Sequence, residues 1–64
     1  MTGAEFKAAR KALGINQRDL AALWGMTEHG EKTIGRWERG ESPMNPIAAY
    51  CIQLMENKNY IVFN

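Results

Sequence analysis

The residue types best suited to chemistry lie within residues 31–39, where long polar side chains alternate with large apolar ones. Lys32 and Arg36 are four residues apart, with Thr33 beside them, whereas Ile34 and Trp37 are three apart and belong to another helix face. Lysine, arginine and hydroxyl groups can hydrogen-bond to base edges in the major groove of DNA, which an α-helix fits. The spacing therefore predicts a helix whose inner face is buried and whose outer face can read base edges.

Catalytic and metal chemistry have little support in the same sequence. His29 is the only histidine and Cys51 the only cysteine, so neither a cysteine-cluster zinc site nor an intramolecular disulfide can form. There is no nucleophile–base arrangement and no phosphate-cradling glycine loop. We expect no enzyme activity, no metal, no cofactor and no small-molecule substrate. We expect His29 in a solvent-facing turn, with a DNA contact as the alternative, and Cys51 as a buried small hydrophobe.

Local signals divide the chain into four helices. Thr2 and Glu5 have the spacing of a capping box for a helix over about 2–13, and Gly14 is placed to end it. Asn16 is a candidate N-cap for a second helix over about 16–24. Its predicted apolar stripe is Leu20, Leu23 and Trp24.

The second half of the chain repeats this pattern. Gly40 is the stop signal for a third helix, and Asn45 followed by Pro46 predicts the start of a fourth, over about 45–56. The predicted buried stripe of that helix is Ile47, Cys51, Leu54 and Met55. We expect a single domain over residues 1–64, all-α and compact, with four to five helices and a short β-like C-terminal tail over 58–64.

The tail has two open interpretations. Its residues 60–63 strongly favour β-structure, and they either fold back over the helices or pair with the same segment of a second subunit. No stretch approaches the roughly 18 apolar residues of a membrane span, and residues 1–10 lack the apolar run of a signal peptide. We therefore expect a cytoplasmic protein of a bacterial or phage-infected cell with no membrane partner.

Three motifs in order give the chain a family resemblance. They are Asn16-Gln17-Arg18-Asp19-Leu20-Ala21, Trp24-Gly25-Met26-Thr27 and Thr33-Ile34-Gly35-Arg36-Trp37-Glu38-Arg39-Gly40. From about Phe6 to Met55 the sequence resembles the Cro/C1-type helix-turn-helix family, also called XRE, of phage repressors and bacterial regulators. Three such pieces at about the right spacing are far more specific than any one alone.

The resemblance implies roles for individual residues. The expected DNA contacts are Gln17 at the start of the second helix, Glu31, Lys32, Thr33 and Arg36 on the recognition helix, and Arg39 at its end. Arg10 and Glu38 match a pair that forms an internal salt bridge in some relatives. One departure is an insertion of three residues between Thr27 and Thr33. Either the turn is longer and the recognition helix begins near Gly30, which we favour, or the helix begins at Thr27 and gains almost a turn.

The function implied is that of a sequence-specific transcriptional regulator that binds double-stranded DNA. We expect a repressor that occupies an inverted-repeat operator as a homodimer, because one copy reads few base pairs and two symmetric copies read two half-sites. A net charge of only +1 keeps an alternative open, a protein-interaction module of the antitoxin-like or phage accessory kind.

Overall fold

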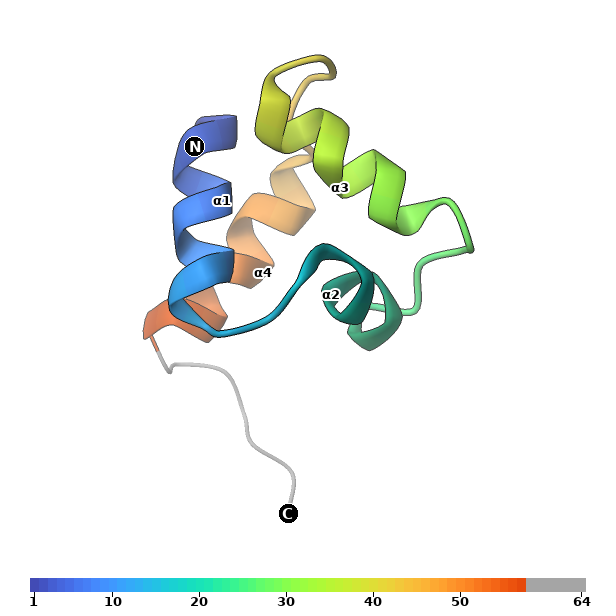
Figure 1. Ribbon diagram of the computed structural model, residues 1–64. Coiled ribbons are helices and arrows are strands. Elements are labelled where there is room, and N and C mark those ends of the chain that lie inside the picture. Colours follow the sequence, from blue (N-terminus) through green and yellow to red (C-terminus); the bar gives the residue numbers. More distant parts are fainter. Residues whose placement is uncertain (58–64) are drawn as a thin grey trace.

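The computed structural model describes residues 1–57 of the chain, and within that range it contains four α-helices and no strand. They are α1 (Gly3–Ala12), α2 (Gln17–Leu23), α3 (Gly30–Arg39) and α4 (Pro46–Asn57). Helix α3 packs against both α1 and α2, and α4 packs against α1 (Figure 1). The all-α fold class is confirmed, whereas the predicted β-like tail lies outside the described residues.

Short-range capping explains where the helices begin. The Thr2 side chain accepts from the Glu5 backbone N–H at 3.1 Å, and the Glu5 carboxylate accepts from the Thr2 N–H at 2.7 Å, which completes the capping box of α1. The Asn16 side chain accepts from the Asp19 N–H at 2.7 Å at the start of α2. The Asn45 side chain accepts from the Ile47 N–H at 2.8 Å at the start of α4. Each cap satisfies a backbone donor that the helix cannot pair internally.

The core takes one fully buried side chain from each helix. Phe6, Leu20, Ile34 and Ile52 have no exposed surface. The Phe6 ring also makes edge-to-face contacts with Trp24 and Trp37, at centroid distances of 6.1 and 5.9 Å. The tryptophans therefore extend the core around α1.

Two apolar side chains that the sequence analysis placed in buried stripes are exposed. Leu23 is 61% exposed and Ile47 is 72% exposed, so the predicted stripes of α2 and α4 were wrong at these positions. The buried residue of α4 next to Ile47 is Ala48, one turn before Ile52. With 3.6 residues per turn, Ile47 points about 120° away from the face that Ala48 and Ile52 share. Helix rotation, which apolar spacing does not fix, decided which residues are covered.

Two further expectations concern the burial of Cys51 and the presence of a membrane-spanning helix. Cys51 is half-buried rather than fully buried. Within residues 1–57, no helix combines the length and the apolar character needed to cross a membrane.

Candidate nucleic-acid interface

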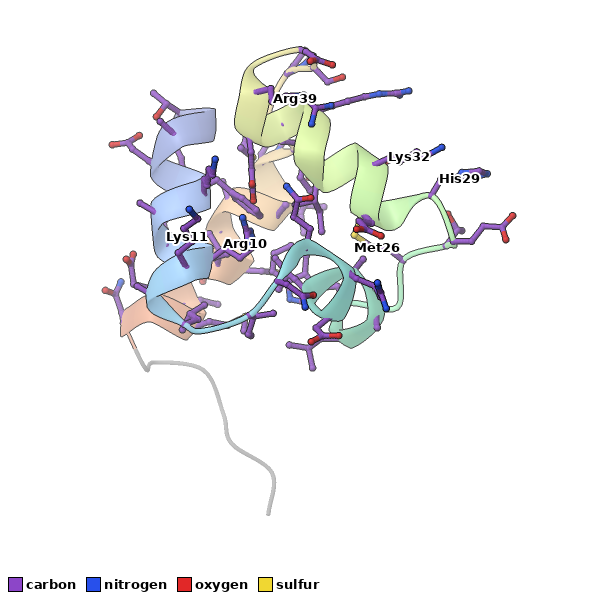
Figure 2. The ribbon with its side chains drawn as sticks, in the orientation of Figure 1. Arg10, Lys11, Met26, His29, Lys32 and Arg39 are labelled. Carbon is purple, nitrogen blue, oxygen red and sulfur yellow. The ribbon has the colours of Figure 1, made fainter. Side chains whose placement is uncertain are left out.

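Helix α3 carries its apolar residues on a buried face and its long polar residues on an exposed one. Ile34 and Trp37 are buried under the helix, at 0% and 8% exposure. Lys32 and Arg36 are exposed on the other side of the helix, whereas exposed Glu31 and half-buried Thr33 lie at the edges of the buried face. In Figure 2 the side chains of Lys32 and Arg39 extend away from the other helices on the same side of α3. The outer face of α3 therefore presents long polar side chains to solvent on a helix anchored from below.

The inserted residues lengthen the turn between α2 and α3. Helix α3 begins at Gly30, with His29 at the N-cap position and no side-chain cap hydrogen bond. A Cβ added at Gly30 would lie 2.6 Å from the Cβ of Met26 and 3.0 Å from that of Ala21. Only glycine leaves the room that this approach to α2 requires. The close contact fixes the point at which α3 departs from α2.

The Thr33 hydroxyl is hydrogen-bonded to the backbone at the start of its own helix. It donates a hydrogen bond to the His29 backbone carbonyl at 3.1 Å. A hydroxyl oxygen that donates in this way keeps its lone pairs, so Thr33 remains able to accept from an external donor.

A surface hollow gathers five of the six predicted DNA-contacting residues. Its lining is Gln17, Glu31, Lys32, Gly35, Arg36, Arg39 and Glu41. Thr33 is absent from that lining. A neighbouring hollow shares Gln17 and Glu31 and is otherwise lined by Lys7, Arg10, Asn16 and Arg18. Residues from α1, α2 and α3 therefore form one continuous polar surface.

A buried polar network lies beneath this surface and joins three helices. Arg10 Nε donates to Glu38 Oε2 at 2.6 Å and Arg10 Nη2 to Glu38 Oε1 at 3.1 Å, while Arg10 Nη1 donates to the Ile15 carbonyl at 2.9 Å. The two charged side chains are 9% and 3% exposed. Gln17 Nε2 also donates to Glu38 Oε1, at 2.9 Å. The structure thus brings Arg10 and Glu38 together and fixes the Gln17 amide against them.

The network controls the ionisation of Glu38. Burial by itself raises the pKa of this carboxyl, but hydrogen bonds from Arg10 and Gln17 act in the opposite direction. The positive charges of Arg10 and Lys7 add to them, and the net result is a lowered pKa. Glu38 therefore stays ionised at neutral pH and holds Gln17 by a charge-assisted hydrogen bond.

At the other end of α3, Arg39 is paired with a residue that the sequence analysis did not single out. Arg39 Nε donates to Glu41 Oε2 at 2.7 Å, and both side chains are more than half exposed. The hydrogen bond and the opposite charge lower the pKa of Glu41 and raise that of Arg39. The charge of Arg39, which is the predicted phosphate contact, is thus partly neutralised by Glu41.

Comparison with known proteins identifies the fold. A family model described as helix-turn-helix matches residues 6–48, which are most of the described chain. The matched range covers α1 from Phe6 onward, the whole of α2 and α3, and the start of α4. The chain belongs to the Cro/C1-type helix-turn-helix family. The helix-turn-helix of this family is a DNA-binding fold.

Two curated relatives share part of this helix-turn-helix domain. The Type II methyltransferase M.SsoII of Shigella sonnei is 41% identical over 39 residues, which are 61% of this chain and 10% of the relative. The Type II methyltransferase M1.ScrFI of Lactococcus lactis subsp. cremoris is 44% identical over 36 residues, 56% of this chain and 9% of the relative. The matched segments therefore span about a tenth of those proteins. No solved structure matches the chain.

The helix-turn-helix surface also includes Lys7, a cation to which the sequence analysis gave no role. Lys7 lines the same hollow as Gln17 and Arg18, and its charge contributes to lowering the pKa of Glu38. Its position three residues before Arg10 on α1 is the signal that would have placed it on this side. Within residues 1–57, no group of three or more His, Cys, Asp or Glu residues could hold a metal ion.

Proposed function

We propose that this helix-turn-helix domain binds double-stranded DNA sequence-specifically, with α3 in the major groove, and acts as a transcriptional repressor. The observation that carries the proposal is the division of α3 between buried Ile34 and Trp37 and the exposed cations Lys32 and Arg36. A recognition helix needs both, because the buried face fixes its orientation and the exposed face meets the base edges.

The residues divide into base readers and backbone contacts. Arg36 is exposed in the middle of the outer face and can pair bidentately with O6 and N7 of guanine. Lys32 can contact a base or a phosphate, Thr33 a base edge, and Glu31 can accept from the N4 amino group of cytosine. Gln17 and Arg39 also line the hollow, where both side chains approach Gly35, and their N–H donors suit phosphate contacts.

We further propose that the protein acts as a homodimer on an inverted repeat. One α3 of ten residues reaches only a few base pairs, so selectivity requires a second half-site about one helical turn away. Exposed Leu23, Ile47 and Tyr50 leave apolar surface on α2 and α4 for contact with another copy. The alternative, a protein-interaction module, predicts no binding to duplex DNA.

Selection of bound duplexes from a random pool tests this function. An inverted-repeat consensus is the expected result, and failure to bind random duplex even at low salt would refute DNA binding. The wild-type protein should prefer the consensus to a site in which the guanine contacted by Arg36 is replaced by another base. The Arg36→Ala variant should lose about 1–3 kcal/mol of this discrimination per half-site.

Arg36→Lys is the matched control for this substitution. It keeps the positive charge but loses the planar fork, so it should retain non-specific affinity while losing discrimination. Discrimination unchanged in both variants would show that Arg36 does not read bases.

A further inference from the structure

We propose that Glu41 competes with the DNA backbone for the Arg39 guanidinium and thereby limits the sequence-independent affinity of the interface. The inference rests on the proposed DNA-binding function, because it concerns the same surface. Glu41 is not among the DNA contacts that the family resemblance implies. Its proposed role is that of a built-in competitor for phosphate.

The end of α3 places the Glu41 carboxylate beside Arg39. Gly40 adopts a left-handed backbone conformation with φ of 76°, and the Glu41 backbone N–H donates to the Arg36 carbonyl at 2.9 Å. This closure turns the chain back at the end of the helix, and Glu41 lines the same polar hollow as Arg36 and Arg39. The carboxylate therefore lies within the surface that we propose meets DNA.

Glu41 occupies the donors that a phosphate would use. Arg39 Nε donates to Glu41 Oε2 at 2.7 Å, and Arg39 Nη2 donates to Glu41 Oε1 at 3.4 Å. A guanidinium binds a carboxylate and a phosphate through the same fork of N–H donors. A DNA phosphate can therefore take this fork only by displacing the carboxylate.

The pair is exposed enough for that exchange. The side chains of Arg39 and Glu41 are 58% and 54% exposed, and Figure 2 shows Arg39 extending away from the helices. An exposed ion pair contributes little to stability, so opening it leaves the fold intact. Phosphate binding then replaces one anion by another at Arg39, and the displaced carboxylate repels the phosphate at close range. Arg39 therefore adds less affinity than an unpaired arginine would.

The test compares the wild-type protein with Glu41→Gln for binding to a random-sequence DNA duplex, at neutral pH and over a series of salt concentrations. The variant removes the charge but keeps the size of the side chain. It should bind roughly fivefold more tightly per protomer at low salt, which is the effect in water of one unit charge about 4 Å from another. Its plot of log affinity against log salt should be steeper by about one, because Arg39 then neutralises a phosphate without giving up a partner.

Glu56→Gln is the matched control for net charge. It makes the same charge change on α4, where Glu56 lines a hollow with residues of α1 and none of α3. Its affinity should stay close to that of the wild type, because salt screens charges beyond about 10 Å. Equal gains in the two variants would show that net charge rather than the Arg39 pair sets the affinity, and would overturn the inference.

An Arg39→Gln background tests whether Glu41 acts through its partner. In that background Glu41→Gln should raise affinity much less, because no guanidinium is then released. An equal gain in both backgrounds would show general repulsion of DNA by Glu41 and would also overturn the inference.

The outcomes separate this inference from the proposed function. Affinity and salt slope unchanged in Glu41→Gln, with the wild type binding duplex, would overturn the role of Glu41 and leave DNA binding intact. Absence of duplex binding by both proteins at low salt would instead refute the proposed function. Thermal unfolding of Glu41→Gln should match that of the wild type, because the pair is exposed.

Discussion

Replacing Glu38 by alanine should remove a large part of the stability of this domain. The carboxylate is 3% exposed and accepts hydrogen bonds from Arg10 on α1 and Gln17 on α2. The substitution leaves the Arg10 guanidinium, itself 9% exposed, with only the Ile15 carbonyl as a partner. The main cost comes from an uncompensated charge that stays buried.

The size of the effect follows from burial. Removing one partner of a buried ion pair typically destabilises a protein by about 3–5 kcal/mol. A chain of 64 residues has a total stability of roughly 3–10 kcal/mol, at about 0.05–0.15 kcal/mol per residue. Glu38→Ala should therefore remove between about a third and all of the stability of the domain.

Urea denaturation followed by circular dichroism at 222 nm measures the free energy of unfolding. Glu41→Ala is the matched control, because its ion pair with Arg39 is more than half exposed, and solvent screening leaves such a pair little effect on stability. A loss for Glu38→Ala no larger than that of the control would refute the reasoning.

A double variant keeps the test informative if Glu38→Ala does not fold. Arg10→Met combined with Glu38→Leu replaces both charges by apolar side chains of similar size, which is often neutral or stabilising for buried pairs. The double variant should be more stable than Glu38→Ala. Equal or lower stability would show that the unpaired Arg10 charge is not the source of the loss.

Two further predictions concern the turn before α3 and the response to acid. Gly30→Ala should lower the free energy of unfolding by about 1–3 kcal/mol, because the new Cβ would lie 2.6 Å from that of Met26. Gly35→Ala should lower it much less, since the atom it meets is the flexible end of Arg39 at 3.0 Å, and equal melting temperatures for the two variants would contradict this packing argument. The lowered pKa of Glu38 contributes stability that is present above about pH 4.3 and is lost as pH falls through the folded-state value. Urea unfolding from pH 6 to pH 2 should therefore show decreasing stability below pH 4, and a rise on acidification would contradict the assignment.

Local sequence signals were sufficient for the helices and for the orientation of α3. The capping hydrogen bonds of Thr2 and Asn16 join residues three apart, so residue type and spacing specify them. The left-handed backbone at Gly40, with φ of 76°, ends α3 in the same local way. A three-residue spacing puts Ile34 and Trp37 on one face of any α-helix, and that face is the one that α3 buries against α1 and α2.

The partners of the site residues depended on how the helices cross. Gln17 contacts Glu38 across 21 residues of sequence, and Lys7 reaches the same surface from α1 only because α1 packs against α3. The exposure of Ile47 was likewise set by the rotation of α4 against α1. Capping and helix-face periodicity act within a turn or two of the chain. Helix rotation, ion-pair partners and the shape of the interface depend on contacts between distant segments, which arise only when the four helices pack together.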